Sequence, residues 1–397
     1  MRFARRIDRI ESSITLALDE RAKAMRAAGR DVVSMAVGEP DFPAPALVQA
    51  AAIEKVRSGD VRYTPAAGTP SLRKTVAEHL TRTRGTPYSA EEVTICHSAK
   101  HALSGAIFAL VEEGDEVLVP LPAWASYFDL VRCAGGIPVL VPPDHRDGVR
   151  PDLAALARAV TPKTRALMIN SPNNPSGYVF TPAEIEGVAR LALERDLWIL
   201  SDEIYRALVY EGGEAVSPVS LSQEVRARTA IIDGASKAFA MTGYRIGFLA
   251  APAPLAAAVA KLHSQTTGSP NAVSQHAFEA GLKTHPPEMD VMRRAFAERR
   301  DFLLAGLRQL GLPCATPRGA FYVFPDVSAH LDGRGSVAFC EELLEAQDLV
   351  LIPGAAFGVD THVRLSYALS QEMISEALRR LGVFLAARRA AARQRAR

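Results

Sequence analysis

The sequence has few cysteines, no long apolar run and almost no net charge, and each shortage excludes a class of protein. Only four of its 397 residues are cysteine. They lie far apart, with no C-x-x-C pair and no nearby pair of histidines, so the sequence predicts no metal site. Buried, reduced thiols are expected instead, at Cys96, Cys133, Cys314 and Cys340.

Neither a membrane span nor a nucleic-acid surface is predicted. The longest apolar stretch, residues 248–260, contains two prolines and falls short of the roughly 20 residues that a span requires. The basic first residues lack an apolar signal core, which favours a cytoplasmic location. A formal charge of +2 creates no broad field for nucleic acid. With 48% hydrophobic residues, the chain can bury the core of one large α/β domain and a smaller one.

Apolar runs bounded by turn residues alternate with longer helical patterns. Each buried strand needs a helix on its face, so this alternation predicts crossover units and one mainly parallel sheet. The predicted strands are residues 93–96, 116–119, 137–141, 166–169, 197–200, 229–233 and 246–250. Two helix starts are well marked: Thr181 is followed by proline and Glu184, and Thr69 is followed by proline.

From about residue 285 the pattern changes. A long charged helix is followed by short strands near residues 321–324 and 363–367 and by a final helix. This pattern predicts a second, smaller α+β domain.

Lys237 follows an apolar strand and stands among small residues, and Arg245 comes eight positions later. Small neighbours let a bulky cofactor approach the lysine amine, and the arginine is a fixed cation that could hold a phosphate. Pyridoxal 5'-phosphate needs both an imine-forming lysine and a phosphate site. A surface lysine in a loop is the alternative, which the other motifs disfavour.

Asp202 lies just past a strand end, and Tyr205 follows three residues later. Open α/β sheets bind ligands at such carboxyl ends. A carboxylate there could pair with the pyridine nitrogen and keep it protonated, which makes the ring an electron sink. Tyr205 is predicted to hydrogen-bond the ring hydroxyl oxygen, and its alternative is a core tyrosine with a satisfied hydroxyl.

Two segments that follow strands are suited to polar ligands. Two prolines and Gly177 make residues 170–177 a rigid turn that holds the amide of Asn174 in place, although a plain strand-to-helix turn is the alternative. A helix begins at Ser98 directly after the strand at 93–96. Its backbone amides and its positive end form an anion site, where the phosphate is expected.

Trp124 and Arg364 complete the pattern. Trp124, one of two tryptophans, follows a proline turn, and its flat indole offers a pyridine ring a large apolar contact; core packing is the alternative. Arg364 falls in a short apolar strand, where burial of a charge without an anionic partner costs free energy. A bidentate clamp on a substrate carboxylate would be worth roughly 1.5–3 kcal/mol, and an internal salt bridge is the alternative.

These motifs, in this order, resemble those of the class I/II aminotransferases, which are fold type I enzymes that carry pyridoxal phosphate on a lysine. The resemblance runs from about residue 13 to about residue 381 and is closest to the aspartate/prephenate aminotransferase subgroup. Ser98 and Ser176 depart from the family pattern. Signatures of other enzymes are absent from the sequence, namely G-x-x-x-x-G-K-[ST], G-x-S-x-G and H-E-x-x-H.

The resemblance implies a large domain at residues 45–284, with a mainly parallel seven-stranded sheet, and a small α+β domain built from residues 1–44 and 285–397. It implies a homodimer with shared active sites, in which Tyr63 reaches the phosphate of the neighbouring subunit. Gly38 would bring a backbone group against the substrate. Lys100 would meet the distal carboxylate of a dicarboxylic substrate, unless it is a solvated helix-end lysine.

The implied activity is ping-pong transfer of an amino group between a dicarboxylic L-amino acid and a 2-oxo acid, with Lys237 as catalytic acid and base. A same-fold enzyme of β- or γ-elimination or oxidation, or a non-catalytic regulator, is the alternative. The predicted cofactor-binding residues are Tyr63, Ser98, Ala99, Lys100, Trp124, Asn174, Asp202, Tyr205, Ser236, Lys237 and Arg245. The predicted substrate-binding residues are Gly38, Lys100, Trp124, Asn174 and Arg364.

Overall fold

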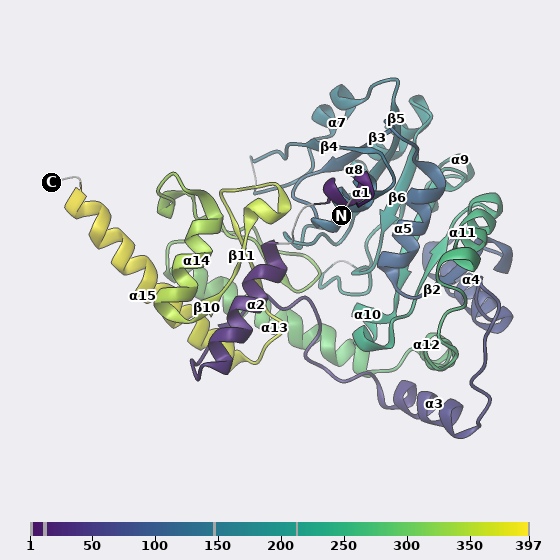
Figure 1. The fold of residues 1–397 in the computed structure, drawn as a ribbon, viewed down its shortest axis with the longest axis horizontal. Coiled ribbons are helices and arrows are strands. Elements are labelled where there is room, and N and C mark those ends of the chain that lie inside the picture. The colour runs from purple at the N-terminus through teal and green to yellow at the C-terminus, as the bar shows by residue number, and fades with distance from the viewer. Residues whose placement is uncertain (1–2, 11–13, 146–147, 212, 396–397) are drawn as a thin grey trace.

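A sheet of seven strands lies at the centre of the computed structural model, which describes residues 3–10, 14–145, 148–211 and 213–395 (Figure 1). Six strands share one direction, and β8 alone runs antiparallel to both of its neighbours. The predicted α/β fold with a mainly parallel sheet is therefore confirmed. In spatial order the strands are β2 (Val93–Cys96), β8 (Gly247–Ala250), β7 (Thr229–Gly234), β6 (Trp198–Asp202), β5 (Thr164–Asn170), β3 (Glu116–Pro120) and β4 (Ile137–Val141).

Helices cover both faces of this sheet, because its strands are apolar on both sides. On β7, Ala230 and Ile232 face one helical layer and Ile231 faces the other. The first layer consists of α5 (Ala99–Leu110), α6 (Ser126–Cys133) and α11 (Ala253–Thr266). The second consists of α4 (Pro70–Arg84), α7 (Leu153–Ala159), α8 (Pro182–Glu194), α9 (Gln223–Arg226) and α12 (Ala272–Thr284), and α3 (Ala46–Arg57) packs against α12.

The two ends of the chain meet in a second hydrophobic cluster beside the sheet. In Figure 1, α2 (Ile14–Ala27) lies among the elements coloured green to yellow from the last third of the chain. These are α13 (Glu288–Gln309), α14 (Gly335–Gln347) and α15 (Gln371–Arg395). Two small sheets join them: β1 (Val33–Ser34) with β10 (Leu349–Val350), and β11 (Ile352–Pro353) with β12 (Val363–Ser366) and β9 (Tyr322–Val323).

Short helical segments connect the larger elements, and capping residues mark where helices begin. The short segments are α1 (Arg5–Asp8), α10 (Ala235–Ala238), η1 (Ala90–Glu92), η2 (Pro218–Ser220), η3 (Thr242–Tyr244), η4 (Ser328–His330) and η5 (Gly354–Phe357). Both predicted helix starts are confirmed. The Thr181 hydroxyl accepts the amide N–H of Glu184 while the Glu184 carboxylate accepts that of Thr181, and Thr69 caps α4 by accepting the amide of Leu72.

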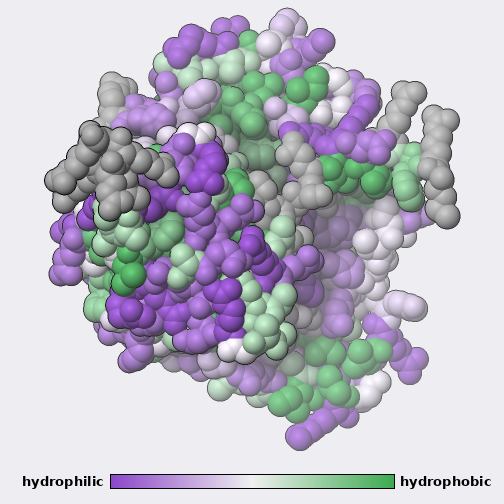
Figure 2. All heavy atoms as spheres, turned by 60° about the vertical axis from the view of Figure 1, so that its left-hand side comes forward, coloured by the Kyte–Doolittle hydropathy of each residue, from purple (hydrophilic) through white to green (hydrophobic). Residues whose placement is uncertain are grey.

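The surface and the cysteines agree with the composition. Figure 2 shows hydrophilic residues over much of one face, with hydrophobic residues gathered in separate patches. Within the described ranges, no helix has the length and apolar character that a bilayer crossing demands. All four cysteines are free; Cys96 and Cys340 are buried, as predicted, whereas Cys133 and Cys314 are only half-buried.

Candidate active site

A pocket of about 320 Å³ lies at the carboxyl ends of the strands, where open α/β sheets bind ligands. It gathers residues from the sheet and from both ends of the chain. All predicted site residues except Tyr63 line it: Gly38, Ser98, Ala99, Lys100, Trp124, Asn174, Asp202, Tyr205, Ser236, Lys237, Arg245 and Arg364. Tyr63 lies outside the pocket with a relative exposure of 100%.

Lys237 is presented by α10, a single helical turn that directly follows β7. Its Nζ donates a hydrogen bond to the carbonyl oxygen of Gly38 across 2.5 Å. Burial is the main reason why the pKa of Lys237 is lowered to about 8, with repulsion from Arg364 and Arg245 adding to the effect. An amine with this pKa is partly neutral near neutral pH, and the neutral form is the one that attacks a carbonyl carbon.

Asp202 ends β6 and is buried. Its Oδ2 accepts a hydrogen bond from the Tyr127 hydroxyl across 2.6 Å, and its Oδ1 accepts one from the amide of Ile204 across 3.2 Å. Burial raises the pKa of Asp202 to about 6, although both hydrogen bonds act in the opposite direction. A cation against this carboxylate, such as a protonated pyridine nitrogen, would offset the cost of its burial.

Tyr205 is buried on the segment that follows Asp202, and its hydroxyl forms a hydrogen bond with the hydroxyl of Tyr322 across 2.9 Å. Its ring packs edge-to-face on Phe321 and Tyr322. Burial raises the pKa of Tyr205 well above its ordinary value, so the phenol stays neutral and can donate. Tyr205 is therefore both a core residue and part of the pocket wall, which combines the two predicted interpretations.

Arg364 enters the pocket from β12 and is 5% exposed. Its Nη1 donates to Asn174 Oδ1 across 3.0 Å, and its Nη2 donates to the carbonyl of Ala36 across 2.8 Å. Its buried Nε has no hydrogen-bond partner among the described residues, and no carboxylate of that part of the chain forms an ion pair with it. The internal salt bridge that was the alternative is thus not found there. A guanidinium with an unpaired donor fits an incoming carboxylate.

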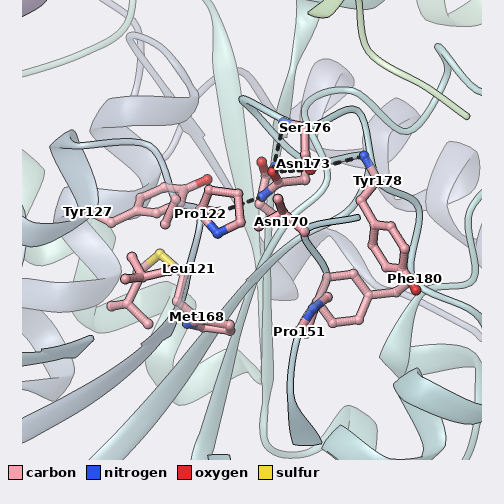
Figure 3. Close-up of a pocket in the computed structure, with 14 residues that line it drawn as sticks. Leu121, Pro122, Tyr127, Pro151, Met168, Asn170, Asn173, Ser176, Tyr178 and Phe180 are labelled. Carbon is pink, nitrogen blue, oxygen red and sulfur yellow. Dashed lines mark hydrogen bonds between the residues drawn. The ribbon is translucent and has the colours of Figure 1, made fainter. Parts of the chain in front are cut away.

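The turn that carries Asn174 is fixed by its own polar groups (Figure 3). Asn170 Oδ1 accepts the amide of Asn174 across 2.8 Å, while Asn173 donates to the Pro122 carbonyl and accepts from the Ser176 hydroxyl. The cavity drawn in Figure 3 measures about 20 Å³, room for about one water molecule. It is therefore a packing feature beside the larger pocket, not a space for a substrate.

The helix at whose start the sequence predicts an anion site begins directly after Ser98. Ser98 is the N-cap residue of this helix, and its hydroxyl accepts the amide of His101 across 3.1 Å. Ser236 and Arg245 line the same pocket, and Arg245 is exposed at its edge, with Nη1 donating to the Thr242 carbonyl across 2.8 Å. A helix N-terminus beside a guanidinium is suited to a phosphate.

Lys100 lies in the first turn of α5, with its Nζ 4.6 Å from the centroid of the Trp124 ring. Partial burial, followed by repulsion from Arg245, lowers the pKa of Lys100. The side chain is exposed to solvent and also lines the pocket. Both predicted interpretations of Lys100 therefore stay open, while Trp124 lies in the pocket wall as expected.

The sequence analysis missed two tyrosines that organise the site, Tyr127 and Tyr322. Tyr127 lies in the first turn of α6, only three residues after Trp124, and its closeness in sequence to a predicted site residue is a signal that could have identified it. Tyr322 belongs to a predicted strand, but its contact with Tyr205 joins residues 117 positions apart. No local pattern indicates such a contact.

The lining of this pocket fits pyridoxal 5'-phosphate. Lys237 could supply an amine for the aldehyde carbon, and buried Asp202 could supply a carboxylate for the ring nitrogen. Trp124 offers an aromatic wall, and the start of α5 offers an anion site. These four features occur together in a space of the size that cofactor sites have.

Comparison with known proteins agrees with this geometry. The sequence model of the family described as aminotransferase class I and II matches residues 30–381. An aspartate aminotransferase of Geobacillus stearothermophilus is 39% identical over 392 residues, covering 98% of this chain and 100% of that protein. An aspartate/prephenate aminotransferase of Thermus thermophilus is 41% identical over 381 residues, covering 95% and 97%.

A solved structure has the same fold. The aspartate aminotransferase from Thermus thermophilus with maleate superposes with a TM-score of 0.92 at 40% identity, covering 97% of this chain and 100% of that one. The chain therefore belongs to the class I and II aminotransferases, and it is an amino-acid aminotransferase of fold type I whose cofactor is pyridoxal 5'-phosphate.

Proposed function

We propose that this enzyme moves an amino group between a dicarboxylic L-amino acid, such as aspartate or glutamate, and a 2-oxo acid by a ping-pong mechanism. The observation that carries this proposal is the pocket itself, in which Arg364 has an unpaired donor and Lys100 adds a second cation. Two carboxylates of one substrate need two such cations. The relatives named aspartate aminotransferase, and the dicarboxylate maleate in one of their structures, support the same substrate class.

Lys237 is the proposed catalytic residue. Its amine would hold the cofactor, give way to the substrate amine and then carry the α-proton, a role suited to a base with a pKa of about 8. Bound pyridoxal phosphate supplies an electron sink for the electrons released at the substrate α-carbon. Asp202 would keep the ring nitrogen protonated, and Tyr205 and Asn174 would donate to the ring oxygen.

The remaining side chains have binding roles in this proposal. The phosphate would rest on Ser98, Ala99, Ser236 and Arg245, and Trp124 would stack on the ring. The substrate α-carboxylate would meet Arg364 and Asn174, while Gly38 would close the pocket above the substrate through its backbone. Lys100 would meet the distal carboxylate.

We also propose a homodimer in which Tyr63 of each subunit completes the phosphate site of the other. Tyr63 is fully exposed and lies outside the pocket of its own chain, which is consistent with a role in a partner copy. The proposed domains are residues 45–284 and, from both chain ends, residues 1–44 with 285–397. The second of these encloses most of the hydrophobic cluster that joins the chain ends. A cytoplasmic location remains a prediction from the sequence.

A half-reaction tests the proposed function. Aspartate or glutamate, added without an oxo acid to the cofactor-loaded enzyme, should change the cofactor absorbance and release one equivalent of 2-oxo acid. The Lys237→Ala variant lacks the base that carries the α-proton and should release no 2-oxo acid, while Lys261→Ala, which removes an exposed lysine of α11, should behave as the wild type. Release of ammonia, or the absence of any spectral change, would contradict the proposal.

The substrate class has its own test. Lys100→Met should lower kcat/KM for aspartate by about tenfold, which corresponds to about 1.4 kcal/mol, and should leave kcat/KM for alanine unchanged. An equal loss for both amino acids would show that Lys100 serves the cofactor and not the distal carboxylate.

A further inference from the structure

A cysteine and two histidines that the proposed mechanism does not use lie together beneath the first turn of α5. Cys96 ends β2, His101 lies in the first turn of α5, and His263 comes from α11. One possible ligand atom from each lies within 4.8 Å of the other two, and this is the one such group in the described part of the chain. The sequence predicted no metal site because His263 lies 167 positions from Cys96.

Two members of the cluster, Cys96 and His263, are buried, and some of the ring nitrogens in and beside it have no hydrogen-bond partner among the described residues. Cys96 is 0% exposed and His263 is 2% exposed, with Cys96 Sγ 4.0 Å from His263 Nδ1. His263 Nε2, and Nε2 of the neighbouring His97, have no hydrogen-bond partner among the described residues. Buried polar atoms almost always have a partner, so these two ring nitrogens are unusual among the described residues and are suited to accept a ligand.

We propose that Cys96, His101 and His263 bind a borderline-soft divalent metal ion of the Zn²⁺ class, with a water molecule as fourth ligand. One thiolate and two neutral imidazoles form a donor set that such ions favour, whereas Mg²⁺ and Ca²⁺ favour oxygen donors.

Metal binding requires small movements and one proton transfer. Zinc bonds of about 2.0–2.3 Å place tetrahedral S and N ligands about 3.5 Å apart. The distance between Cys96 Sγ and His263 Nδ1, now 4.0 Å, must therefore shorten by about 0.5 Å. The His101 ring must turn out of its stack on His263, where the centroids are 3.7 Å apart, and give up its hydrogen bond with Thr267. The Cys96 thiol releases its proton to water as the sulfur–metal bond forms.

This site is separate from the pocket, but two of its ligands flank a segment of backbone that lines the pocket. None of the three ligands lines the pocket, whereas Ser98, Ala99 and Lys100, which lie between Cys96 and His101, do. A bound ion would therefore tie together the two ends of the segment that forms the anion site. Gly105 helps to keep His263 in reach, because a Cβ there would come within 2.7 Å of His263 Nε2.

Co²⁺ is the probe that tests the site in the cofactor-loaded enzyme, because four-coordinate Co²⁺ has visible bands at longer wavelength than the cofactor. We expect one bound Co²⁺ per chain after gel filtration, with the intense bands of tetrahedral coordination, and displacement by Zn²⁺. Both the Cys96→Ser and the His101→Gln variants should lose the ion and the bands. Cys340→Ser and His330→Gln, which alter a cysteine and a histidine outside the cluster, should retain both.

The absence of retained Co²⁺ in the wild type would overturn the proposal, as would equal binding by Cys96→Ser and His101→Gln. Because Cys96 is buried, its variant could fail to fold; His101 is half-buried, so His101→Gln then decides the outcome alone. The readout is metal content and its spectrum, which do not depend on the amino donor. Failure of this proposal is therefore distinct from failure of the proposed function.

Discussion

The Tyr127 hydroxyl donates a hydrogen bond to Asp202 Oδ2 across 2.6 Å, and both residues are buried. The bond opposes the burial that raises the pKa of Asp202 to about 6. A hydrogen bond to a charged group stabilises the charged form by about 1.5–3 kcal/mol. Tyr127 therefore helps to keep Asp202 ionised in surroundings that favour its neutral acid.

Replacing Tyr127 with phenylalanine should raise the pKa of Asp202 further, and should lower kcat by about twofold at pH 7 and by about tenfold near pH 5. Loss of about 1.4 kcal/mol of stabilisation corresponds to about one pH unit. Since the carboxylate then takes up its proton at a higher pH, the acid limb of the kcat profile should move upward by about one unit. Initial rates at saturating substrate across the pH range measure this shift.

Tyr178→Phe is the matched control for Tyr127→Phe. The Tyr178 hydroxyl also donates to a carboxylate, that of Glu184, across 2.8 Å, but Tyr178 does not line the pocket that contains Lys237, whereas Tyr127 does. Its loss should leave the acid limb in place. An unmoved limb in Tyr127→Phe as well would mean that Asp202 does not control this part of the profile.

Lys237 should destabilise the cofactor-free protein near neutral pH. Its pKa of about 8 in the folded state lies below its ordinary value of 10.5, so between these two values the unfolded chain binds more protons and stability rises with pH. Lys237→Met should therefore raise the free energy of unfolding at pH 7 by on the order of 2 kcal/mol. Urea unfolding of cofactor-free protein at pH 7 and pH 10 should show this gain shrinking at the higher pH.

Lys261→Met separates this effect from a general gain in hydrophobicity, because Lys261 is exposed on α11. Its effect on stability should be small and the same at both pH values. If the gain in unfolding free energy for Lys237→Met were the same at pH 7 and pH 10, the pKa of Lys237 would not be lowered in the folded protein.

Arg364→Lys should lower kcat/KM by about 10- to 100-fold for every amino donor. The guanidinium forms two hydrogen bonds within the protein and leaves Nε for a ligand, and an ammonium cannot reproduce this planar fork. A charge-assisted bond of about 1.5–3 kcal/mol sets the size of the loss. Rates with aspartate and alanine should fall together, in contrast to Lys100→Met, and cofactor affinity should stay unchanged. A selective loss for aspartate would assign Arg364 to the distal carboxylate.

Local patterns in the sequence predicted the strands and the residues at their carboxyl ends. Asp202 and Asn174 follow apolar runs, and parallel strands bring such ends to one edge of a sheet, so their meeting was foreseeable. The antiparallel direction of β8 could not be predicted, because an apolar run does not indicate the direction in which its strand runs. The bounds of the strands moved by up to two residues, since tertiary pairing and not local composition decides where a ladder ends.

Contacts between distant residues could not be predicted from spacing. Tyr127 and Asp202 are 75 positions apart, and Lys237 and Gly38 are 199 apart. Each contact depends on how whole elements pack, and each polar atom involved has several chemically equivalent partners elsewhere in the chain. Only the resemblance to a known family indicated Gly38, and nothing in the sequence indicated the place of His263.

Gly247→Ala should destabilise the fold and weaken cofactor binding together. A Cβ at Gly247 would lie 2.5 Å from Ala99 N and 2.6 Å from Ser98 C, which are backbone atoms of the anion site and cannot turn aside. We expect a loss of about 1–3 kcal/mol in unfolding free energy and at least about tenfold weaker cofactor binding. Gly243→Ala is the control, because a Cβ there meets no atom within 4 Å. Equal effects of the two variants would contradict a steric cause.

Tyr63 provides a test of shared active sites by complementation. Lys237→Ala should be inactive, and Tyr63→Ala should bind the cofactor about tenfold more weakly, so that it has little activity at limiting cofactor. In a mixed dimer, if Tyr63 serves the partner, one site would combine the intact Lys237 of the Tyr63 variant with the intact Tyr63 of the Lys237 variant. The other site would carry both defects.

Unfolding and refolding the two variants together should therefore restore activity at limiting cofactor to as much as about a quarter of the wild-type value, because about half of the dimers are mixed and each has one intact site. If Tyr63 instead serves its own chain, every site retains one defect and mixing restores nothing.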